Sequence, residues 1–341
     1  MSSRRTPRDT RSCGDPTRKD PGGTGESPTM DVMRGLEGIE DCTSPTVLTI
    51  GNFDGIHLGH QRMLQRLRRR AEASAVPAVL LTFCPHPVEV LRPDLPHCLI
   101  QTLEQKLETL EALGFVDRVV VIPFTQEFSR MPAEQFIEEV LWRRFHPRRI
   151  IVGFNFSFGR DGVGNPEMLE RFGEKWGFCV EVVAPVEVEG RVVSSSEIRK
   201  DLRQGRVVAA RTLLGRPYGV RGRVVRGDGR GRTLGFPTAN VEIEGDCCLK
   251  KGVYAVLVKR CGKSLPGVAN IGVRPTFSQE ENASPLLEVH LFDFHDTIYG
   301  ERIEVAFIDR IRDEIRFGGV EALKRQLTED IREARRRLEE A

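Results

Sequence analysis

TVLTIGNFDGIHLGH, residues 46–60, decides how the first half of the chain folds. It opens with a short apolar run that stops at Gly51, as a buried parallel strand does when it ends in a turn. The glycines that follow lack a Cβ atom, so the backbone can turn sharply and approach a ligand closely. A helix is expected to begin at about residue 56, and the N-terminus of a helix attracts phosphate. The stretch therefore predicts a strand, a ligand-binding turn and a helix.

His57 and His60 are three residues apart, so a helix places both on one face of its first turn. Their imidazole N–H groups would stand beside backbone N–H groups that have no partner within the helix. This arrangement suits a reaction at the α-phosphate of a nucleotide, where the protein positions the reactants and neutralises charge on the non-bridging oxygens. A zinc pair and two ordinary surface histidines are the alternatives, although zinc needs further ligands and the chain has no HExxH or CxxC motif.

The composition is that of a globular protein long enough for two domains. Of 341 residues, 39% are hydrophobic and 29% are charged. The 51 basic and 49 acidic residues give a net charge of +2, so composition gives no general reason to expect a nucleic-acid or membrane partner. The eight cysteines show neither a disulfide framework nor metal-ligand spacing, which fits a reducing cytoplasm. Residues 1–29 have almost no large apolar side chains and are expected to be disordered.

Between residues 46 and 184, strand-like apolar runs alternate with helical patterns, which predicts a doubly wound parallel sheet. The expected strands are 46–50, 78–83, 119–122, 149–153 and 178–184. In such folds ligands bind outside the carboxyl ends of the strands. Three motifs stand there: GNFDGIHLGH after the first strand, PHP at 85–87 after the second, and GFNFSFGRDGVGN at 153–165 after the fourth.

Three groups of residues in this half are further site candidates. The prolines around His86 make a rigid loop that can aim an imidazole. Asn155 can orient a flat ring that aromatic side chains such as Phe158 flank, although phenylalanines beside a strand also serve as core. Ser194, Ser195 and Ser196 begin a helical pattern that ends at Gly205, so their hydroxyls and Arg199 can meet an anion at the helix start. Capping alone is the alternative role for the serines.

From Tyr218 onward the strands come close together, which indicates antiparallel pairing in a small closed barrel. The expected strands are 218–225, 253–259, 266–272, 286–294 and 302–309. The chain ends in an amphipathic helix that is expected to pack on the barrel, with a partner helix as the alternative. Its apolar stripe consists of Val320, Leu323, Leu327, Ile331 and Leu338.

GDGRGRTLGFPTAN, residues 227–240, is expected to form a mobile loop that covers phosphates. Thr238 and Asn240 offer a hydroxyl and an amide oxygen of the kind that Mg²⁺ accepts beside phosphate oxygens. Glu288 lies in an apolar strand pattern, where a carboxylate is costly unless it is paired or used. A general base that takes a proton from a substrate hydroxyl is one use, and a salt-bridged or rim-exposed side chain is the alternative.

These motifs together resemble the bacterial bifunctional riboflavin kinase/FAD synthetase family. GNFDGIHLGH is similar to the signature of the HxGH nucleotidyltransferases, TFCPHP at 82–87 to the family's TFxPHP, and GFNFSFGRDGVGN to GxNFxFGxxxxGN. SSSEIR matches SSTxIR with one hydroxyl residue exchanged, and Cys84 stands where the family often has an acidic residue. In the second half the resemblance is carried by GRTLGFPTAN, KGVYA at 251–255, NIGVRPTF at 270–277, EVHLFDF at 288–294 and FIDRIRDEIRF at 307–317. MDVMRGLEGIED, from Met30, resembles the usual beginning of the family.

The resemblance implies two consecutive reactions. A kinase domain at 217–341 would phosphorylate riboflavin with MgATP to FMN, and an adenylyltransferase domain at 30–186 would convert FMN and ATP to FAD and pyrophosphate. A helical linker at 187–216 would contribute the SSSxIR motif. Glu288 would be the base, Thr238 and Asn240 would hold Mg²⁺, and His57, His60 and Arg199 would neutralise the ATP phosphates. Other substrate-binding positions would be Gly51, Phe53, Asp54, Gly55, His86, Asn155, Phe158, Ser194, Ser195, Ser196, Gly231, Thr233, Gly235 and Pro237.

We therefore expect a cytoplasmic enzyme with riboflavin, FMN and ATP as its small-molecule partners and Mg²⁺ as its cofactor. No tightly bound prosthetic group, nucleic acid or membrane is expected, and a homo-oligomer is left open. Two rival functions remain from the sequence. One is an HxGH nucleotidyltransferase for another phosphate, which would need no barrel. The other is a flavin-binding or RNA-binding regulator without ATP chemistry.

Overall fold

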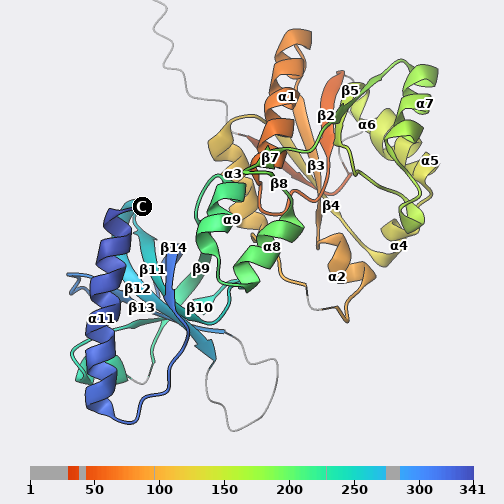
Figure 1. The fold of residues 1–341 in the computed structure, drawn as a ribbon. Helices are drawn as coiled ribbons and strands as arrows, with labels where there is room; N and C mark the ends of the chain where they lie inside the picture. Colours follow the sequence, from red (N-terminus) through yellow and green to blue (C-terminus); the bar gives the residue numbers. More distant parts are fainter. Residues whose placement is uncertain (1–29, 38–43, 96, 228, 274–284) are drawn as a thin grey trace, which may run out of the picture.

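The computed structural model describes residues 30–37, 44–95, 97–227, 229–273 and 285–341. They form an α/β domain, two helices beside it and a β-barrel with a long terminal helix (Figure 1). The expected disorder of residues 1–29 lies outside the described residues. Within the described ranges, no helix has the length and apolar character needed to cross a membrane.

The first domain is built on a six-stranded sheet with the order β1-β4-β3-β2-β5-β6. Every neighbouring pair in it is parallel, which confirms the doubly wound fold. All five residues of β2 are buried, which explains its continuous apolar pattern. The chain order reverses between β2 and β5, so the turn after β2 opens at the switch point of the sheet. The strands are β1 (Asp31–Arg34), β2 (Thr46–Ile50), β3 (Ala78–Cys84), β4 (Arg118–Pro123), β5 (Pro147–Gly153) and β6 (Cys179–Val183).

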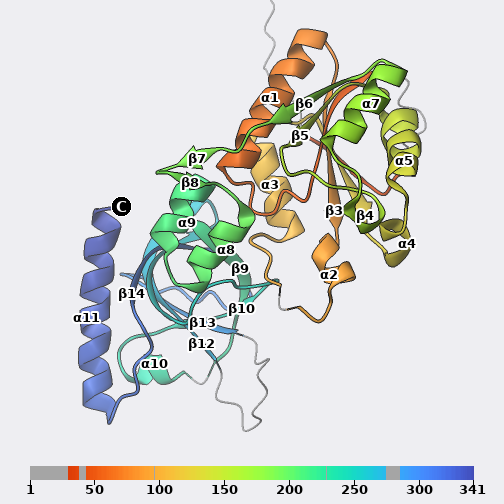
Figure 2. The same cartoon turned by 45° about the vertical axis from the view of Figure 1, so that its right-hand side comes forward.

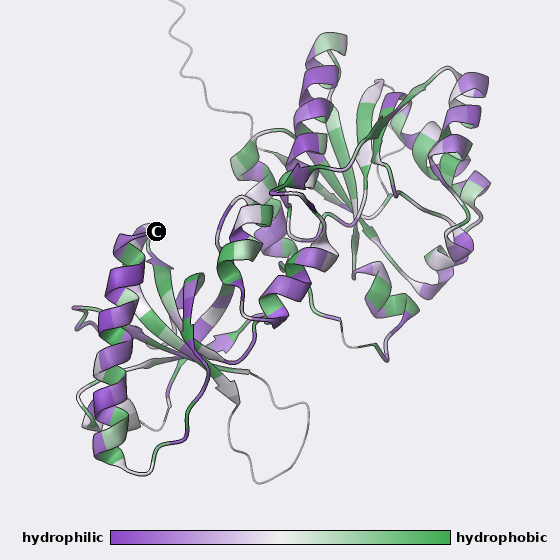
Figure 3. Ribbon diagram, viewed as in Figure 1, coloured by the Kyte–Doolittle hydropathy of each residue, from purple (hydrophilic) through white to green (hydrophobic). Residues whose placement is uncertain are grey.

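Helices cover both faces of this sheet and turn their apolar sides toward it (Figure 3). One face packs against α1 (Leu58–Ser74) and α3 (Leu103–Leu113). The other packs against a helical stretch that begins at α5 and against α7. The expected helix around Phe136 is present but contains a π-helical segment. The remaining elements are α2 (Pro87–Leu91), α4 (Gln126–Ser129), α5 (Ala133–Gln135), η1 (Phe136–Trp142), α6 (Arg143–Phe145), η2 (Arg160–Gly162) and α7 (Pro166–Trp176).

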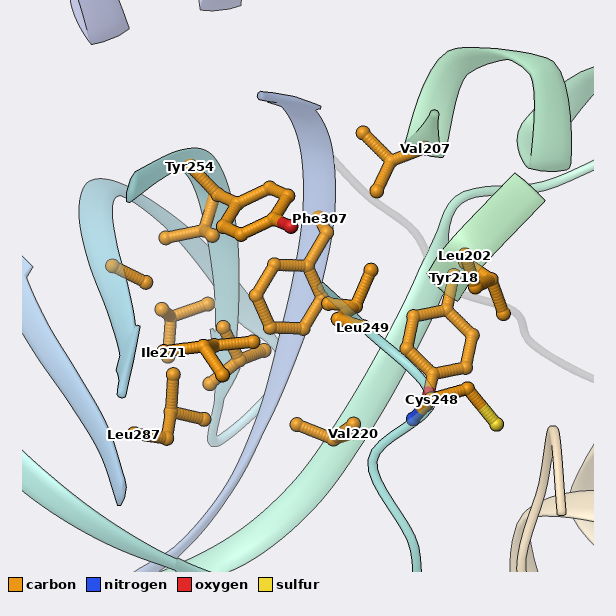
Figure 4. Packing of buried hydrophobic residues seen from close by; sticks show 14 of the residues in the cluster. Leu202, Val207, Tyr218, Val220, Cys248, Leu249, Tyr254, Ile271, Leu287 and Phe307 are labelled. Atoms are coloured by element: carbon orange, nitrogen blue, oxygen red, sulfur yellow. The ribbon is translucent and has the colours of Figure 1, made fainter. Parts of the chain in front are cut away.

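Two helices lie between the domains, as the rotated view in Figure 2 shows. A short hairpin of β7 (Glu187–Val188) and β8 (Arg191–Val192) leads into α8 (Ser195–Arg203) and α9 (Val207–Leu214). Their apolar side chains do not form a core of their own. Ile198, Leu202 and Val207 are buried in the same cluster as Tyr218 and Phe307 of the barrel (Figure 4). By packing, α8 and α9 belong to the second domain.

The second domain is a closed barrel with the order β10-β13-β12-β11-β14-β9, in which every pair is antiparallel, as expected. Two details of the prediction are wrong. The stretch expected to be only loop contains α10 and the start of β10, because Val241 is buried between β9 and β13. The expected strand 286–294 ends at Leu291. The elements are β9 (Tyr218–Val225), α10 (Arg230–Thr233), β10 (Ala239–Ile243), β11 (Gly252–Arg260), β12 (Lys263–Val273), β13 (Pro285–Leu291) and β14 (Arg302–Arg312).

The terminal helix, α11 (Val320–Glu339), packs on β11, β12 and β14, as predicted. Ile331 and Leu338 lie against the barrel beside buried Ala334. Val320 was expected in the same stripe but is 53% exposed, because the helix begins beyond the edge of this contact. The helix also buries Asp330, whose carboxylate accepts two hydrogen bonds from Arg312. This contact is therefore both apolar and ionic.

The cysteines correct a further expectation. Cys98 in the first domain and Cys248 in the second form a disulfide, with their Cα atoms 5.7 Å apart. The spacing of the cysteines in the sequence had indicated no disulfide framework. The two residues are 150 positions apart, so their spacing carries no signal and only the folded chain brings them together.

Candidate active sites

The turn between β2 and α1, residues 51–57, is fixed by bonds to its carbonyl groups. Three distant side chains donate to them: Lys106 Nζ to Asn52 (2.7 Å), Ser195 Oγ to Asp54 (2.9 Å) and Arg216 Nη2 to Gly55 (2.7 Å). The turn also needs unusual backbone angles. Gly55 has φ of +88°, and an added Cβ would lie 3.0 Å from Ile100. The expected strand, turn and helix are thus confirmed, and α8 helps to hold the turn.

His57 caps α1, and its ring stacks on His60 with centroids 3.6 Å apart. His57 Nδ1 accepts the backbone N–H of His60 at 3.2 Å. A neutral imidazole that accepts at Nδ1 carries its proton on Nε2, so His57 presents an Nε2–H donor. His60 Nδ1 is buried and has no hydrogen-bond partner among the described residues. The pair therefore offers one hydrogen-bond donor, His57 Nε2–H, and one buried atom, His60 Nδ1, that can bond to a ligand or water.

Burial keeps this histidine pair neutral. It lowers the pKa of His57 to about 4, with smaller contributions from Arg216 and Arg199. It also lowers the pKa of His60 well below the usual value, and the charge of Lys106 acts in the same direction. At neutral pH both rings are therefore hydrogen-bonding groups rather than cations.

Asp54 and Arg199 form a buried ion pair beside these rings. Arg199 Nη2 lies 2.5 Å from Asp54 Oδ2, and its Nε donates to the carbonyl of Cys98 at 2.7 Å. Asp54 also accepts from the backbone N–H groups of Ile100 and Gln101. Because Nε and Nη2 hold these contacts, the Nη1 end of the guanidinium points away from the carboxylate. Arg199 is thus anchored on one edge and can meet a phosphate with the other.

His86 and an unpredicted histidine, His97, stack on each other with centroids 4.8 Å apart. His86 caps α2, where its Nδ1 accepts the N–H of Val88, and burial lowers its pKa to about 3. His97 Nε2 is 3.3 Å from Arg199 Nη2. This stack extends the site along the carboxyl ends of β2 and β3. Four histidines and Arg199 therefore lie at the carboxyl ends of the strands.

The remaining predicted residues of the first domain have different positions. Phe53 is buried against His60, with ring centroids 4.9 Å apart. Phe158 packs in the core between Phe136 and Phe156, where it is 9% exposed. Asn155 is exposed. Ser194 caps α8, Ser196 is exposed on that helix, and Gly51 extends the ladder of β2 by bonding to Leu81.

In the barrel, Asn240 and Glu288 are direct cross-strand partners on β10 and β13. Asn270 on β12 is the partner of Glu288 on its other side. Cross-strand partners have Cβ atoms about 4.5–5.5 Å apart and point to the same face. Their neighbours Val241 and Leu287 face the barrel interior, so the row Asn240–Glu288–Asn270 lies on the outer face. Asn270 was missing from the predicted site.

The segment before β10 folds back over this row. A Cβ on Gly231 would lie 2.5 Å from the carbonyl oxygen of Phe236 and 3.1 Å from Thr238 Oγ1, so only glycine fits there. His290, two residues after Glu288, is bonded through Nδ1 to the carbonyl of Pro237 at 2.8 Å. Thr233 and Gly235 are exposed at the end of α10. The glycine-rich segment is therefore tied to the face of β13 that carries Glu288, and its expected role in covering phosphates stays a prediction.

The oxygen atoms at this place suit magnesium. Thr238 directly precedes β10 and Asn240 is the second residue of that strand, a spacing that places two side chains on one face when the strand direction continues. A hydroxyl and an amide oxygen are hard ligands, and Mg²⁺ is usually held by only one or two protein groups together with phosphates and water. Among the described residues, no cluster of three His, Cys, Asp or Glu side chains could hold a metal alone. The donor set fits a metal that arrives with a nucleotide.

A cavity of about 400 Å³ lies between α3, β9 and β14, and none of the predicted site residues lines it. Its walls carry the contacts that join the two domains. Arg221 on β9 is bonded to Glu108 of α3 and to Glu304 of β14. We therefore interpret it as a gap in the domain interface.

Sequence reasoning missed four residues of these sites: Lys106, Arg216, His97 and Asn270. Lys106 is 6% exposed and also donates to Thr82 Oγ1 at 3.3 Å, which ties the turn after β2 to β3. In the sequence it stands in an amphipathic helix, where a lysine normally faces water. Asn270 is the first residue of the NIGVRPTF motif. Its position beside Glu288 becomes clear only from the strand register.

The lowered pKa of His57 predicts that acid destabilises the fold. Below about pH 6.5 the unfolded chain binds a proton at this residue, whereas the native protein does so only near pH 4. Stability therefore falls as pH drops through this window, by about 2 kcal/mol between pH 7 and 5 for His57 alone. Denaturant unfolding of the wild type and His57→Asn at both pH values measures this difference. Asparagine can also cap the helix, so an identical pH dependence in the two proteins would contradict the prediction.

Comparisons with known proteins match both halves of the chain. The family model described as FAD synthetase matches residues 39–197, and the one described as riboflavin kinase matches residues 214–338. The bifunctional riboflavin kinase/FMN adenylyltransferase of Pseudomonas fluorescens is 40% identical over 306 residues, which cover 90% of this chain and 97% of that protein. Its counterpart in Haemophilus influenzae is 39% identical over 307 residues, with 90% and 98% covered. A crystal structure described as a macrolide-efflux protein from Streptococcus pneumoniae aligns with a TM-score of 0.79 at 32% identity, covering 88% of this chain and 97% of that one.

Proposed function

Because the chain belongs to the family of bifunctional riboflavin kinase/FMN adenylyltransferases, we propose how its two reactions are divided between the two sites. The enzyme phosphorylates riboflavin to FMN and adenylylates FMN to FAD. We assign the kinase reaction to the barrel at 217–341. The adenylyl transfer is assigned to residues 30–186 together with the linker at 187–216, since α8 supplies Ser195 and Arg199 to the turn after β2.

In adenylyl transfer, a phosphate oxygen of FMN attacks the α-phosphate of ATP in line with the departing pyrophosphate. The protein needs no nucleophile of its own, so its task is to position the phosphates and to stabilise their charge. His57 Nε2–H donates to a non-bridging oxygen, and His60 lies stacked beside it. The Nη1 end of Arg199 binds the polyphosphate while Asp54 and Cys98 hold its other edge. The gathering of these groups at the switch point of the sheet carries this proposal.

In the kinase reaction, Glu288 takes the proton from the ribityl 5′-hydroxyl as that oxygen attacks the γ-phosphate. Asn240 and Asn270 flank the carboxylate on neighbouring strands and orient the groups around it. Mg²⁺, when bound with ATP, would be held by Thr238 and Asn240 and would supply positive charge to the transferring phosphoryl group. His290 holds Pro237 and so keeps the segment before β10 over the site.

We further propose a cytoplasmic enzyme, because both reactions consume ATP. Its partners are riboflavin, FMN and ATP, and the net charge of +2 supports the absence of a nucleic-acid partner.

Product analysis tests the proposal. Purified protein is incubated with riboflavin and ATP, with Mg²⁺ or with a chelator, and the flavins are separated by chromatography over time. We expect FMN to appear before FAD, and no product with the chelator. Bound flavin without ATP consumption would favour the regulator instead, and full activity in the chelator would contradict the metal assignment.

A further inference from the structure

Residues 97–101, here called the strap, connect the turn after β2 to the barrel. On one side, the N–H of Ile100 donates to Asp54 at 3.0 Å and the carbonyl of Cys98 accepts from Arg199 at 2.7 Å. On the other side, the N–H of Leu99 donates to Asp246 Oδ2 at 2.9 Å. The strap therefore touches both members of the buried ion pair and also the second domain.

The disulfide joins this strap to the barrel. The Cα atoms of Cys98 and Cys248 are 5.7 Å apart, within the usual range of about 4.4–6.8 Å for disulfides. Cys248 is 4% exposed, and its backbone N–H donates to Tyr218 Oη. Its sulfur points away from Phe307 at the barrel centre (Figure 4). Cys98 is only half-buried, so it is the more accessible of the two cysteines.

We propose that Cys98 and Cys248 form a reversible modification site through which small thiols and disulfides set the ATP affinity of the adenylyltransferase. The inference rests on the proposed role of Arg199 as a phosphate ligand. Disulfides in a compartment rich in glutathione are usually transient and redox-sensing rather than structural. A disulfide at this place acts on the site directly, because Cys98 supplies the carbonyl that anchors Arg199.

Reduction proceeds by two thiol–disulfide exchanges with a low-molecular-weight thiol such as glutathione. A glutathione thiolate attacks Cys98 Sγ, a mixed disulfide forms, and Cys248 leaves as a thiolate that takes up a proton. A second glutathione thiolate attacks the glutathione sulfur, and Cys98 leaves as a thiolate that is protonated in turn. The protein gains two thiols and the products include glutathione disulfide. Oxidation by glutathione disulfide is the reverse.

Cys247, adjacent to Cys248, is a poor competitor in this exchange. Burial raises the pKa of its thiol to about 11, so little thiolate is present near neutral pH. The structure also leaves Cys247 as a free thiol. Thiol–disulfide exchange should therefore form the Cys98–Cys248 disulfide rather than a disulfide with Cys247.

The oxidised protein holds Arg199 ready for the phosphates, and reduction releases the strap. An anchor that moves must be ordered again when ATP binds, so affinity falls. We expect the KM for ATP in FAD formation from supplied FMN to rise by about three- to tenfold on reduction, which lies within the range for loss of one hydrogen bond of typical net strength. Riboflavin phosphorylation should be unchanged, because the strap bonds to the second domain through Asp246, whereas Glu288 and Asn240 lie on the outer face of β13 and β10.

The experiment compares the full-length protein equilibrated with glutathione disulfide and with excess dithiothreitol. Free thiols are then alkylated, and non-reducing peptide mass spectrometry identifies the disulfide pairs. KM and kcat are measured for both reactions in each state. Cys98→Ser and Cys98→Ala should show the high KM in both states. A variant with Cys179→Ser and Cys261→Ser, which removes two exposed free cysteines, and Cys247→Ser should respond like the wild type.

Three results would overturn the proposal: no Cys98–Cys248 peptide in the oxidised protein, equal KM values in the two states, or a redox response that persists in both Cys98 variants. Failure of the proposed function gives a different result. If Arg199 is no phosphate ligand, Arg199→Lys leaves the KM for ATP unchanged while the disulfide peptide still forms. If the domain assignment is wrong, reduction changes the kinase reaction instead.

Discussion

With alanine at both His57 and His60, FAD formation is abolished while riboflavin phosphorylation continues, so FMN accumulates. The two rings lie at the turn after β2 and contribute nothing to the row around Glu288. Loss of a single preorganised donor typically lowers kcat by about 10²–10³-fold, and the variant loses two polar rings. Chromatography of the flavins formed from riboflavin and ATP measures both reactions in one sample.

Two further variants make the result specific. His57→Asn keeps a side chain that can cap α1, but it removes the Nε2–H donor, so it should fold normally and still fail to make FAD. His146→Asn changes an exposed histidine of the same domain and should keep both activities. FAD formation at the wild-type rate by the double alanine variant would disprove the assignment of this site.

Glu288→Gln should lower riboflavin phosphorylation by about 10²–10⁴-fold, the usual contribution of general-base catalysis. Glutamine keeps the size and hydrogen bonding of the side chain but cannot accept the hydroxyl proton. Adenylyl transfer should survive, because its nucleophile is already an anion and the residues assigned to it gather around the turn after β2. Supplying FMN in place of riboflavin should therefore restore FAD synthesis.

Glu242→Gln is the matched control, since Glu242 is an exposed glutamate on the neighbouring strand β10. It should retain the wild-type kinase rate. Undiminished FMN formation by Glu288→Gln would show that Glu288 is not the general base and has a structural role only. Failure of the folded variant to make FAD from supplied FMN would mean that the two sites are coupled more tightly than separate domains imply.

Local patterns were enough to predict much of the fold. The apolar runs of β2 to β6 and the helix that ends at Gly114 follow from burial, periodicity and glycine at a left-handed C-cap. The short edge strand β1 was missed, because its four residues are largely exposed and make no apolar run. The strand β10 was missed because a glycine-rich segment leads into it.

The site divides in the same way. His57, His60, Asn240 and Glu288 stand in contiguous motifs, so each could be predicted from its neighbours in the sequence. The contacts that hold the turn after β2 come from far along the chain. Lys106 of α3 and Arg216, between α9 and β9, donate to its carbonyl groups, and the strap donates to Asp54 through Ile100. Such contacts depend on the packing of whole elements, and a single sequence contains no local sign of them. For the same reason the pairing of Arg199 with Asp54 was not predicted, although Arg199 was expected to neutralise the ATP phosphates.

The helix α8 also bears on how such a protein can be inherited. Residues 198–213 lie between the two stretches that match family models, yet Ile198 and Leu202 are in the barrel core. On the same helix, Ser195 and Arg199 complete the turn of the first domain. A gene break before α8 would remove Arg199 from the first domain, and one after it would open the core of the second domain. Recombination that replaces one half with that of a homologue therefore succeeds only if α8 still packs against both halves. This requirement favours inheritance of the two activities as a single gene.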